Sequence, residues 1–129
     1  MFENVNRGTY RVGDKDIFFR SGWERNWAVY LQWQKEQGMI KDWEYEPERF
    51  YFIDNSTDPP RALGNGYLPD FKVTRLNDKP YYDELKGYKQ GKIKLKRMKK
   101  YHPTVEINLI EAKEYNETKK KIGKMLNWI

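Results

Sequence analysis

One stretch, residues 66–86, constrains this chain more than any other, because its composition is typical of two extended segments joined by a turn. The first segment covers residues 67–74 and the second covers residues 80–86. Residues 75–79 between them contain Asn-Asp shortly before a proline, which is a turn composition. We therefore expect an antiparallel pair of strands connected by a tight turn.

This expected hairpin places two acidic side chains opposite each other. In an antiparallel hairpin, residues symmetric about the turn centre face one another, and Asp70 and Glu84 are symmetric about Asn77. Side chains alternate between the two faces of a strand, so Lys86 shares the face of Glu84. The opposite face then holds Tyr81, Asp83 and Leu85. The pattern predicts two carboxylates and one ammonium on one patch.

Such a patch favours a metal site. Carboxylates that face each other on a sheet repel, so Asp70 and Glu84 need a positive charge between them. A divalent cation such as Mg²⁺ fits, since it takes carboxylate oxygens while keeping several waters. It can activate a water molecule and neutralise charge on a phosphate oxygen. Lys86 would then lie beside the attacking water or the scissile phosphate.

Composition narrows the chemistry further. The chain has 129 residues, a net charge of +6, no cysteine and a single histidine, His102. The basic balance favours a polyanionic partner. The absence of cysteine excludes disulfides, zinc fingers and thiol nucleophiles, and one histidine excludes metal sites built on several histidines and His-based nuclease motifs. A catalytic or metal-binding site in this chain would therefore be built on carboxylates.

The length corresponds to one domain, residues 1–129. No apolar run approaches transmembrane length, and residues 1–10 lack the charged start and apolar stretch of a signal peptide. We expect a cytoplasmic protein.

A helix should begin after Ser21, a good N-cap, and end at Gly38. Glu24, three residues after Ser21, has two interpretations. It completes a capping box by bonding the backbone N–H of Ser21, or it supplies a further carboxylate to the metal site. The sequence leaves both open.

A second helix is expected over residues 89–101, where Leu95, Met98 and Tyr101 recur at helical spacing. Charge runs usually mark a solvated helix face, but a run of one sign that directly follows the carboxylate strand favours phosphate contact. His102 should cap this helix or lie at the surface rather than act as a catalytic base. The candidate phosphate-binding residues are Lys92, Lys94, Lys96, Arg97, Lys99 and Lys100.

The remaining segments complete an α/β fold. We expect an irregular start with turn points at Gly8 and Gly13, then one or two core strands over residues 39–53, interrupted at Pro47. Residues 54–66 are predicted to form a loop long enough to touch substrate.

After the lysine-rich helix, residues 104–110 alternate like a half-buried strand, and residues 113–129 have helical spacing. A strand, helix, strand order favours a right-handed crossover with parallel pairing. The prediction is a mixed central sheet of about four to five strands flanked by helices.

The motif Pro69-Asp70 followed by Glu84-Leu85-Lys86 resembles the signature of the PD-(D/E)XK nuclease superfamily. The phrases FRSGWE at residues 19–24, WEYEP at residues 43–47 and YLPDFKV at residues 67–73 resemble small phage-encoded endonucleases of this superfamily, some of which are similar to Holliday junction resolvases.

The resemblance extends over roughly residues 20–115 and implies a restriction-endonuclease-like core. It implies that Asp70 and Glu84 bind Mg²⁺ or Mn²⁺, that Lys86 orients or activates the attacking water, and that Glu24 assists as a further catalytic and metal-binding carboxylate. For a phage-encoded protein, the location would be the host cytoplasm.

We therefore favour the interpretation that the protein is a metal-dependent endodeoxyribonuclease. Within this class, the favoured activity is the resolution of branched DNA, that is, of Holliday junctions. Resolution needs two symmetric cuts, so a homodimer is expected. Two alternatives stay open: a non-catalytic basic nucleic-acid-binding protein, and a nuclease that acts on other DNA or on RNA.

Overall fold

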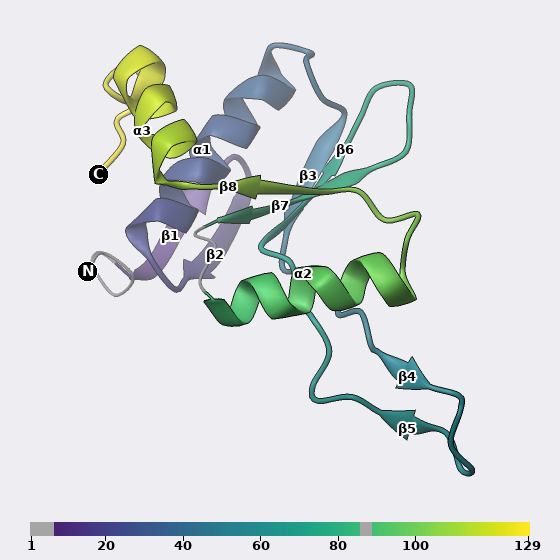
Figure 1. The fold of residues 1–129 in the computed structure, drawn as a ribbon. Helices are drawn as coiled ribbons and strands as arrows, with labels where there is room; N and C mark the ends of the chain where they lie inside the picture. Colours follow the sequence, from purple (N-terminus) through teal and green to yellow (C-terminus); the bar gives the residue numbers. More distant parts are fainter. Residues whose placement is uncertain (1–6, 86–88) are drawn as a thin grey trace.

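The chain forms a mixed α/β structure, described in this computed structural model for residues 7–85 and 89–129. The α-helices of the described residues are α1 (Gly22–Glu36), α2 (Lys89–Tyr101) and α3 (Ala112–Thr118). Figure 1 shows α1 above the central sheet and α2 below it. The expected arrangement of a sheet flanked by helices is confirmed.

Among the described residues, the central sheet has four strands in the order β3-β6-β7-β8. Strand β6 pairs antiparallel with both β3 and β7, whereas β7 and β8 are parallel. Helix α2 forms the connection between these two parallel strands, as predicted for a crossover. The strands are β3 (Asp42–Tyr45), β6 (Phe71–Thr74), β7 (Tyr81–Leu85) and β8 (Ile107–Ile110).

The hairpin of β6 and β7 has the predicted register. Phe71 pairs with Asp83 and Val73 pairs with Tyr81, so the pairs are symmetric about Asn77. The next position outward therefore sets Asp70 opposite Glu84. The first strand is shorter than residues 67–74, because Pro69 has no N–H to donate to a ladder and β6 begins only at Phe71.

The two faces of β7 point into different apolar clusters. Leu85 belongs to the main core, together with Trp27 and Leu31 of α1. On the other face, the phenol of Tyr67 bonds to Glu84, and Tyr67 packs with Phe52 and Met98 in a second cluster. The predicted alternation along this strand is thus confirmed.

Both long helices form where the sequence predicts. Ser21 caps α1, its hydroxyl accepting from the Glu24 N–H at 3.2 Å. Gly38, with φ +74°, follows the end of α1 in the left-handed conformation that glycine adopts most easily. Helix α2 has the predicted bounds, and its Met98 is buried. None of the helices in the described part of the chain is long and apolar enough to cross a membrane.

The prediction of an irregular start was wrong for the described part of residues 1–20. Strands β1 (Gly8–Val12) and β2 (Lys15–Phe19) form an antiparallel hairpin closed at Gly13, where φ is +62°. The outer face holds the exposed Phe18 beside Thr9, Arg11 and Asp16, which obscured the alternation, while Val12 and Phe19 pack in the main core beside α1.

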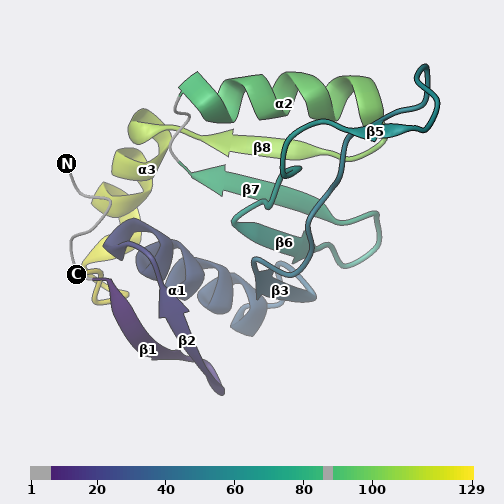
Figure 2. The same ribbon diagram turned by 90° about the horizontal axis from the view of Figure 1, so that it is seen from below.

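The predicted loop at residues 54–66 contains a short strand pair, β4 (Ile53–Asp54) with β5 (Arg61–Ala62). We call residues 51–66 the arm, because they project from the body of the protein (Figure 1). The arm begins and ends at an isolated bridge between Phe50 and Tyr67, which we call the neck. Figure 2 shows the arm passing across the side of the sheet on which α2 lies.

The C-terminal segment is not the single helix expected over residues 113–129. Helix α3 passes into a wider π-helical turn, η1 (Lys119–Gly123), and the chain then folds back through Asn127, whose φ is +57°. This return brings Trp128 onto Tyr115, with ring centroids 5.0 Å apart. Both rings also lie near Trp27 of α1, with centroid distances of 6.2 and 6.4 Å, so aromatic packing onto α1 accompanies the end of the regular helix.

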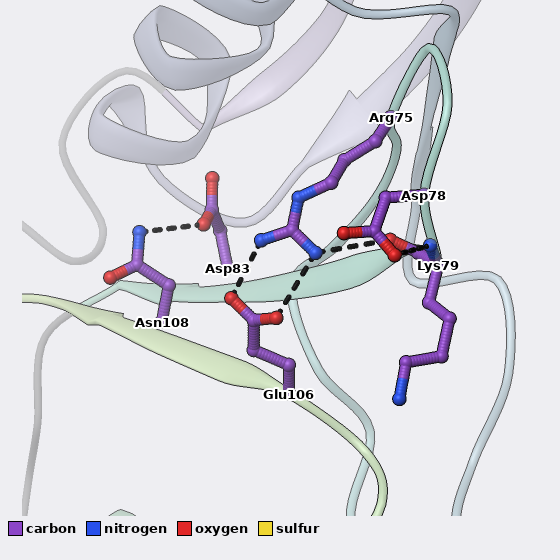
Figure 3. Close-up of polar contacts among 6 residues, drawn as sticks. All are labelled: Arg75, Asp78, Lys79, Asp83, Glu106 and Asn108. Carbon is purple, nitrogen blue, oxygen red and sulfur yellow. Dashed lines mark hydrogen bonds and ion pairs between the residues drawn. The ribbon is translucent and has the colours of Figure 1, made fainter.

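Polar contacts fasten the turn of the β6–β7 hairpin to the start of β8 (Figure 3). The guanidinium of Arg75 forms a bidentate ion pair with the Glu106 carboxylate, with N–O distances of 3.0 and 2.7 Å. It also donates to the backbone carbonyl of Lys79 at 3.1 Å. Further along the same strands, the Asn108 amide donates to the Asp83 carboxylate at 3.1 Å. These contacts hold β7 and β8 in line.

Candidate active site

Asp70 lies immediately before β6 and is buried. Its Oδ2 accepts the backbone N–H of Leu85 at 2.8 Å, a bond that crosses the hairpin beside Glu84. Burial is the main cause that raises the pKa of Asp70 well above its usual value, and the negative charges of Glu84 and Glu24 raise it further. A buried carboxylate that is repelled by neighbouring negative charges favours binding of a proton or a cation.

Glu84 lies on the face of the sheet that α2 covers, where Tyr67 contacts it. Its Oε1 accepts the hydroxyl of Tyr67 at 2.9 Å. Burial raises the pKa of Glu84 to about 7, and the charge of Glu24 acts in the same direction. The hydrogen bonds from Tyr67 and from the Asp70 backbone oppose this rise in pKa, as does the positive charge of Lys94.

At Glu24 the structure shows only half of the expected capping box, because the carboxylate bonds Tyr45 and not the backbone N–H of Ser21. Its backbone N–H is the one that Ser21 caps, while its carboxylate Oε1 accepts the Tyr45 hydroxyl at 2.7 Å. The side chain is buried, and its charge raises the pKa of both Asp70 and Glu84. The three predicted carboxylates come from α1, the start of β6 and β7, and they are near enough for the charge of Glu24 to act on the other two.

A fourth carboxylate, Glu46, was missed by the sequence reasoning. Its N–H donates to the Asp70 carbonyl at 2.8 Å, and Arg20 lies 3.4 Å from its carboxylate. Burial raises the pKa of Glu46, and the Glu24 charge adds to this. Glu46 belongs to the phrase at residues 43–47 that carries part of the family resemblance, and its position directly before the predicted interruption at Pro47 was the available signal.

The carboxylates at this site include one opposed pair that suits a divalent cation. Within residues 7–85 and 89–129, no group of three or more His, Asp or Glu side chains is arranged to hold a metal ion. The opposed pair of Asp70 and Glu84 still fits Mg²⁺, because this ion is commonly held by one or two carboxylates and keeps waters in its remaining positions. Their raised pKa values indicate a site short of positive charge.

Lys86, the predicted lysine of the motif, lies outside the described residues. Lys94, on α2, is the cation whose charge lowers the pKa of Glu84. The sequence placed Lys94 with the phosphate-binding group, because helical spacing alone does not indicate which turn of α2 lies over the sheet.

The other candidate cations of α2 have different surroundings. Lys96, Lys99 and Lys100 are exposed. Lys92 lies 3.9 Å from Glu111 in an exposed ion pair. A methyl group added at Gly64 would lie 3.6 Å from the Arg97 guanidinium, so Arg97 lies against the arm. The basic surface therefore extends from α2 toward the arm.

His102 ends α2, as expected for a capping histidine. The backbone N–H of His102 donates to the Met98 carbonyl at 2.8 Å, and the ring Nε2 lies 2.7 Å from the carbonyl oxygen of Tyr51. The ring therefore joins the end of α2 to the base of the arm.

No protein-family model, curated protein or solved structure matches the chain. The candidate site rests on the geometry and chemistry described above.

Proposed function

We propose that this protein is a metal-dependent endodeoxyribonuclease. The observation that carries the proposal is the pair of Asp70 and Glu84, two carboxylates set opposite each other with raised pKa values and with Glu24 near both. Clustered carboxylates with perturbed pKa values are costly to fold and are typical of functional sites. The basic helix α2 adjoins them and offers a surface for a polyanion.

The order of the elements supports a restriction-endonuclease-like core. A helix with Glu24 comes first, then the hairpin with Asp70 and Glu84, then the lysine-rich α2 and the parallel strand β8. This is the order that the resemblance to PD-(D/E)XK nucleases implies. Fold alone does not choose a substrate among the many that one fold can serve.

The residues have distinct roles in the proposed reaction. Asp70 and Glu84 would hold Mg²⁺ or Mn²⁺, with Glu24 as a further carboxylate. When bound, the ion supplies Lewis acidity that activates water and stabilises charge on the phosphate. Lys86 would orient the attacking water, and Lys94 would offset the negative charge beside Glu84. The exposed cations of α2 would bind the DNA backbone.

The substrate we propose is branched DNA, cut as a phage-type junction-resolving enzyme would cut it, in the cytoplasm of the host. The net charge of +6 suits a partner with densely spaced phosphates. Two symmetric cuts need two sites, so the active form would be a homodimer.

The test compares a labelled four-way DNA junction with its linear duplex, each with Mg²⁺ and with chelator. Glu84→Ala is the test variant, and Glu117→Ala, an exposed position on α3, is the matched control. We expect symmetric, metal-dependent nicking of the junction by the wild type and Glu117→Ala but not by Glu84→Ala. Sedimentation of the same samples gives the oligomeric state.

The other outcomes are informative. Cutting of both substrates indicates a broader nuclease, for which RNA and single strands are the next substrates to assay. Binding without cutting overturns the proposal in favour of a non-catalytic nucleic-acid-binding protein.

A further inference from the structure

Tyr67 is a buried residue, 2% exposed, whose polar end reaches the candidate site. Its hydroxyl donates to Oε1 of Glu84 at 2.9 Å. Two backbone bonds of 2.7 Å to Phe50 fix its position at the neck. Its ring packs in the cluster of Phe52 and Met98, so the hydroxyl cannot swing away.

Gly66 shows how closely the two sides of the neck approach. A methyl group added at Gly66 would lie 2.3 Å from the Phe50 carbonyl oxygen, and φ at Gly66 is +74°. Only glycine fits there without moving the backbone. The neck therefore holds Tyr67 in one place relative to β7.

Tyr45 stands in the same relationship to Glu24. Its hydroxyl donates to Oε1 of Glu24 at 2.7 Å. Its ring lies between Phe19 and Phe71, with centroid distances of 4.8 and 5.3 Å. The tyrosine comes from β3 and the glutamate from α1, so packing of the core decides the contact.

Each of these bonds uses a named oxygen of the carboxylate. Tyr67 takes Oε1 of Glu84 and Tyr45 takes Oε1 of Glu24, while Leu85 N–H takes Oδ2 of Asp70. A carboxylate has two oxygens, so a donor fixed on one oxygen sets the direction of the other. A tyrosine hydroxyl keeps its proton at neutral pH, so each tyrosine is a hydrogen-bond donor to the carboxylate oxygen it contacts.

We propose that Tyr67 and Tyr45 are positioning residues: Tyr67 holds one oxygen of Glu84 and thereby directs the other oxygen to a divalent cation, and Tyr45 fixes Glu24, whose charge acts on the two carboxylates of that site. This inference rests on the proposed function, because it needs the carboxylates to bind a metal. Donors behind metal-binding side chains orient them and change metal affinity when removed.

The experiment titrates the DNA-free protein with Mn²⁺ by calorimetry. Tyr67→Phe and Tyr45→Phe each remove one hydroxyl and keep the ring. The matched control is Tyr82→Phe, whose hydroxyl donates to Glu48 from the same strand as Glu84. Thermal unfolding in chelator is measured for each variant, so that a change in affinity is separated from a loss of fold.

We expect Tyr67→Phe to weaken Mn²⁺ binding by roughly 10-fold or more, Tyr45→Phe to weaken it less, and Tyr82→Phe to stay within about twofold of wild type. Folded Tyr67→Phe and Tyr45→Phe proteins that bind Mn²⁺ as the wild type does would overturn the inference while leaving the nuclease proposal intact. A wild type whose Mn²⁺ binding is absent, or unchanged by Glu84→Ala, would instead overturn the metal site itself. If Tyr67→Phe does not fold, Tyr45→Phe decides the matter by the same comparison.

Discussion

The indole N–H of Trp27 donates to Oδ2 of Asp83 at 2.8 Å, which joins α1 to β7 inside the core. Asp83 is 2% exposed, and its other oxygen accepts the Asn108 amide (Figure 3). Strand β7 thus has a second buried carboxylate, on the opposite face from Glu84. Neutral hydrogen-bond donors satisfy both oxygens of Asp83, so we assign this carboxylate a structural role.

Replacing Asp83 by Asn should change the pH dependence of stability. Burial raises the pKa of Asp83 from 3.8 to about 6, so the folded state binds its proton more tightly than the unfolded state does. The contribution of Asp83 to wild-type stability therefore falls as the pH rises from about 4 to about 6, and this penalty is complete above that range. Asp83→Asn lacks this penalty.

We expect the free energy of unfolding of Asp83→Asn, relative to wild type, to increase by roughly 3 kcal/mol between pH 4 and pH 8. Urea unfolding of both proteins across this range measures the difference. A constant difference over the range would show that burial does not perturb this carboxyl.

Glu84→Gln should stabilise the metal-free protein while abolishing cleavage. Because the pKa of Glu84 is raised to about 7 from 4.5, deprotonation costs stability between these pH values, and the full cost applies at pH 8. We expect the Tm of the variant in chelator at pH 8 to rise by about 4 °C for each kcal/mol relieved. Added Mg²⁺ should raise the Tm of the wild type only.

Glu48→Gln provides a control of opposite sign. The hydrogen bond from Tyr82 lowers the pKa of Glu48, so its charged form stabilises the fold and its neutralisation should lower the Tm. Equal shifts for Glu48→Gln and Glu84→Gln would contradict the repulsion that we assign to the candidate site.

Removing three cations of the basic surface should weaken DNA binding and its salt dependence. The variant replaces Lys96, Arg97 and Lys100 by Ala. Each phosphate contact contributes about 0.9 to the slope of log K against log salt, so we expect the slope to fall by roughly 2 to 3. Fluorescence anisotropy over a salt series measures it.

The matched variant replaces exposed lysines of the C-terminal segment, namely Lys113, Lys120 and Lys121. It has the same net charge, so a local interface predicts a smaller change in slope than for the α2 variant. Equal slopes for the two variants would mean that α2 is not the phosphate-binding surface.

Gly66→Ala should destabilise the neck far more than Gly38→Ala destabilises the end of α1. Both glycines have φ +74°, but only Gly66 has the Phe50 carbonyl in the way, since nothing lies within 4 Å of a methyl group at Gly38. The left-handed backbone alone costs about 1–2 kcal/mol at either site. The clash should add roughly 1–3 kcal/mol at Gly66.

Urea unfolding of the two variants measures this difference directly. Similar losses of stability would indicate that the neck can open without cost, and that Tyr67 is not fixed by it.

Helix bounds and hairpin register could be predicted because each depends on residues close in sequence. Ser21 and Gly38 mark the ends of one helix, and the pairs symmetric about Asn77 set Asp70 opposite Glu84. The β1–β2 hairpin was missed, because its exposed Phe18 breaks the apolar alternation and its buried Phe19 packs on residues of α1 and β3 that lie far along the chain. The π-helical turn after α3 was missed because stacking of Trp128 on Tyr115 has no local signal.

By itself, the sequence determined which carboxylates could meet and which helix would be basic, because strand alternation, helical spacing and caps are local properties. Tertiary structure alone decided what surrounds those carboxylates. Tyr67 is 17 residues from Glu84, and Tyr45 is 21 residues from Glu24. Their contacts exist because the neck and the core bring distant segments together, and burial at that meeting point raises the pKa values of Asp70 and Glu84.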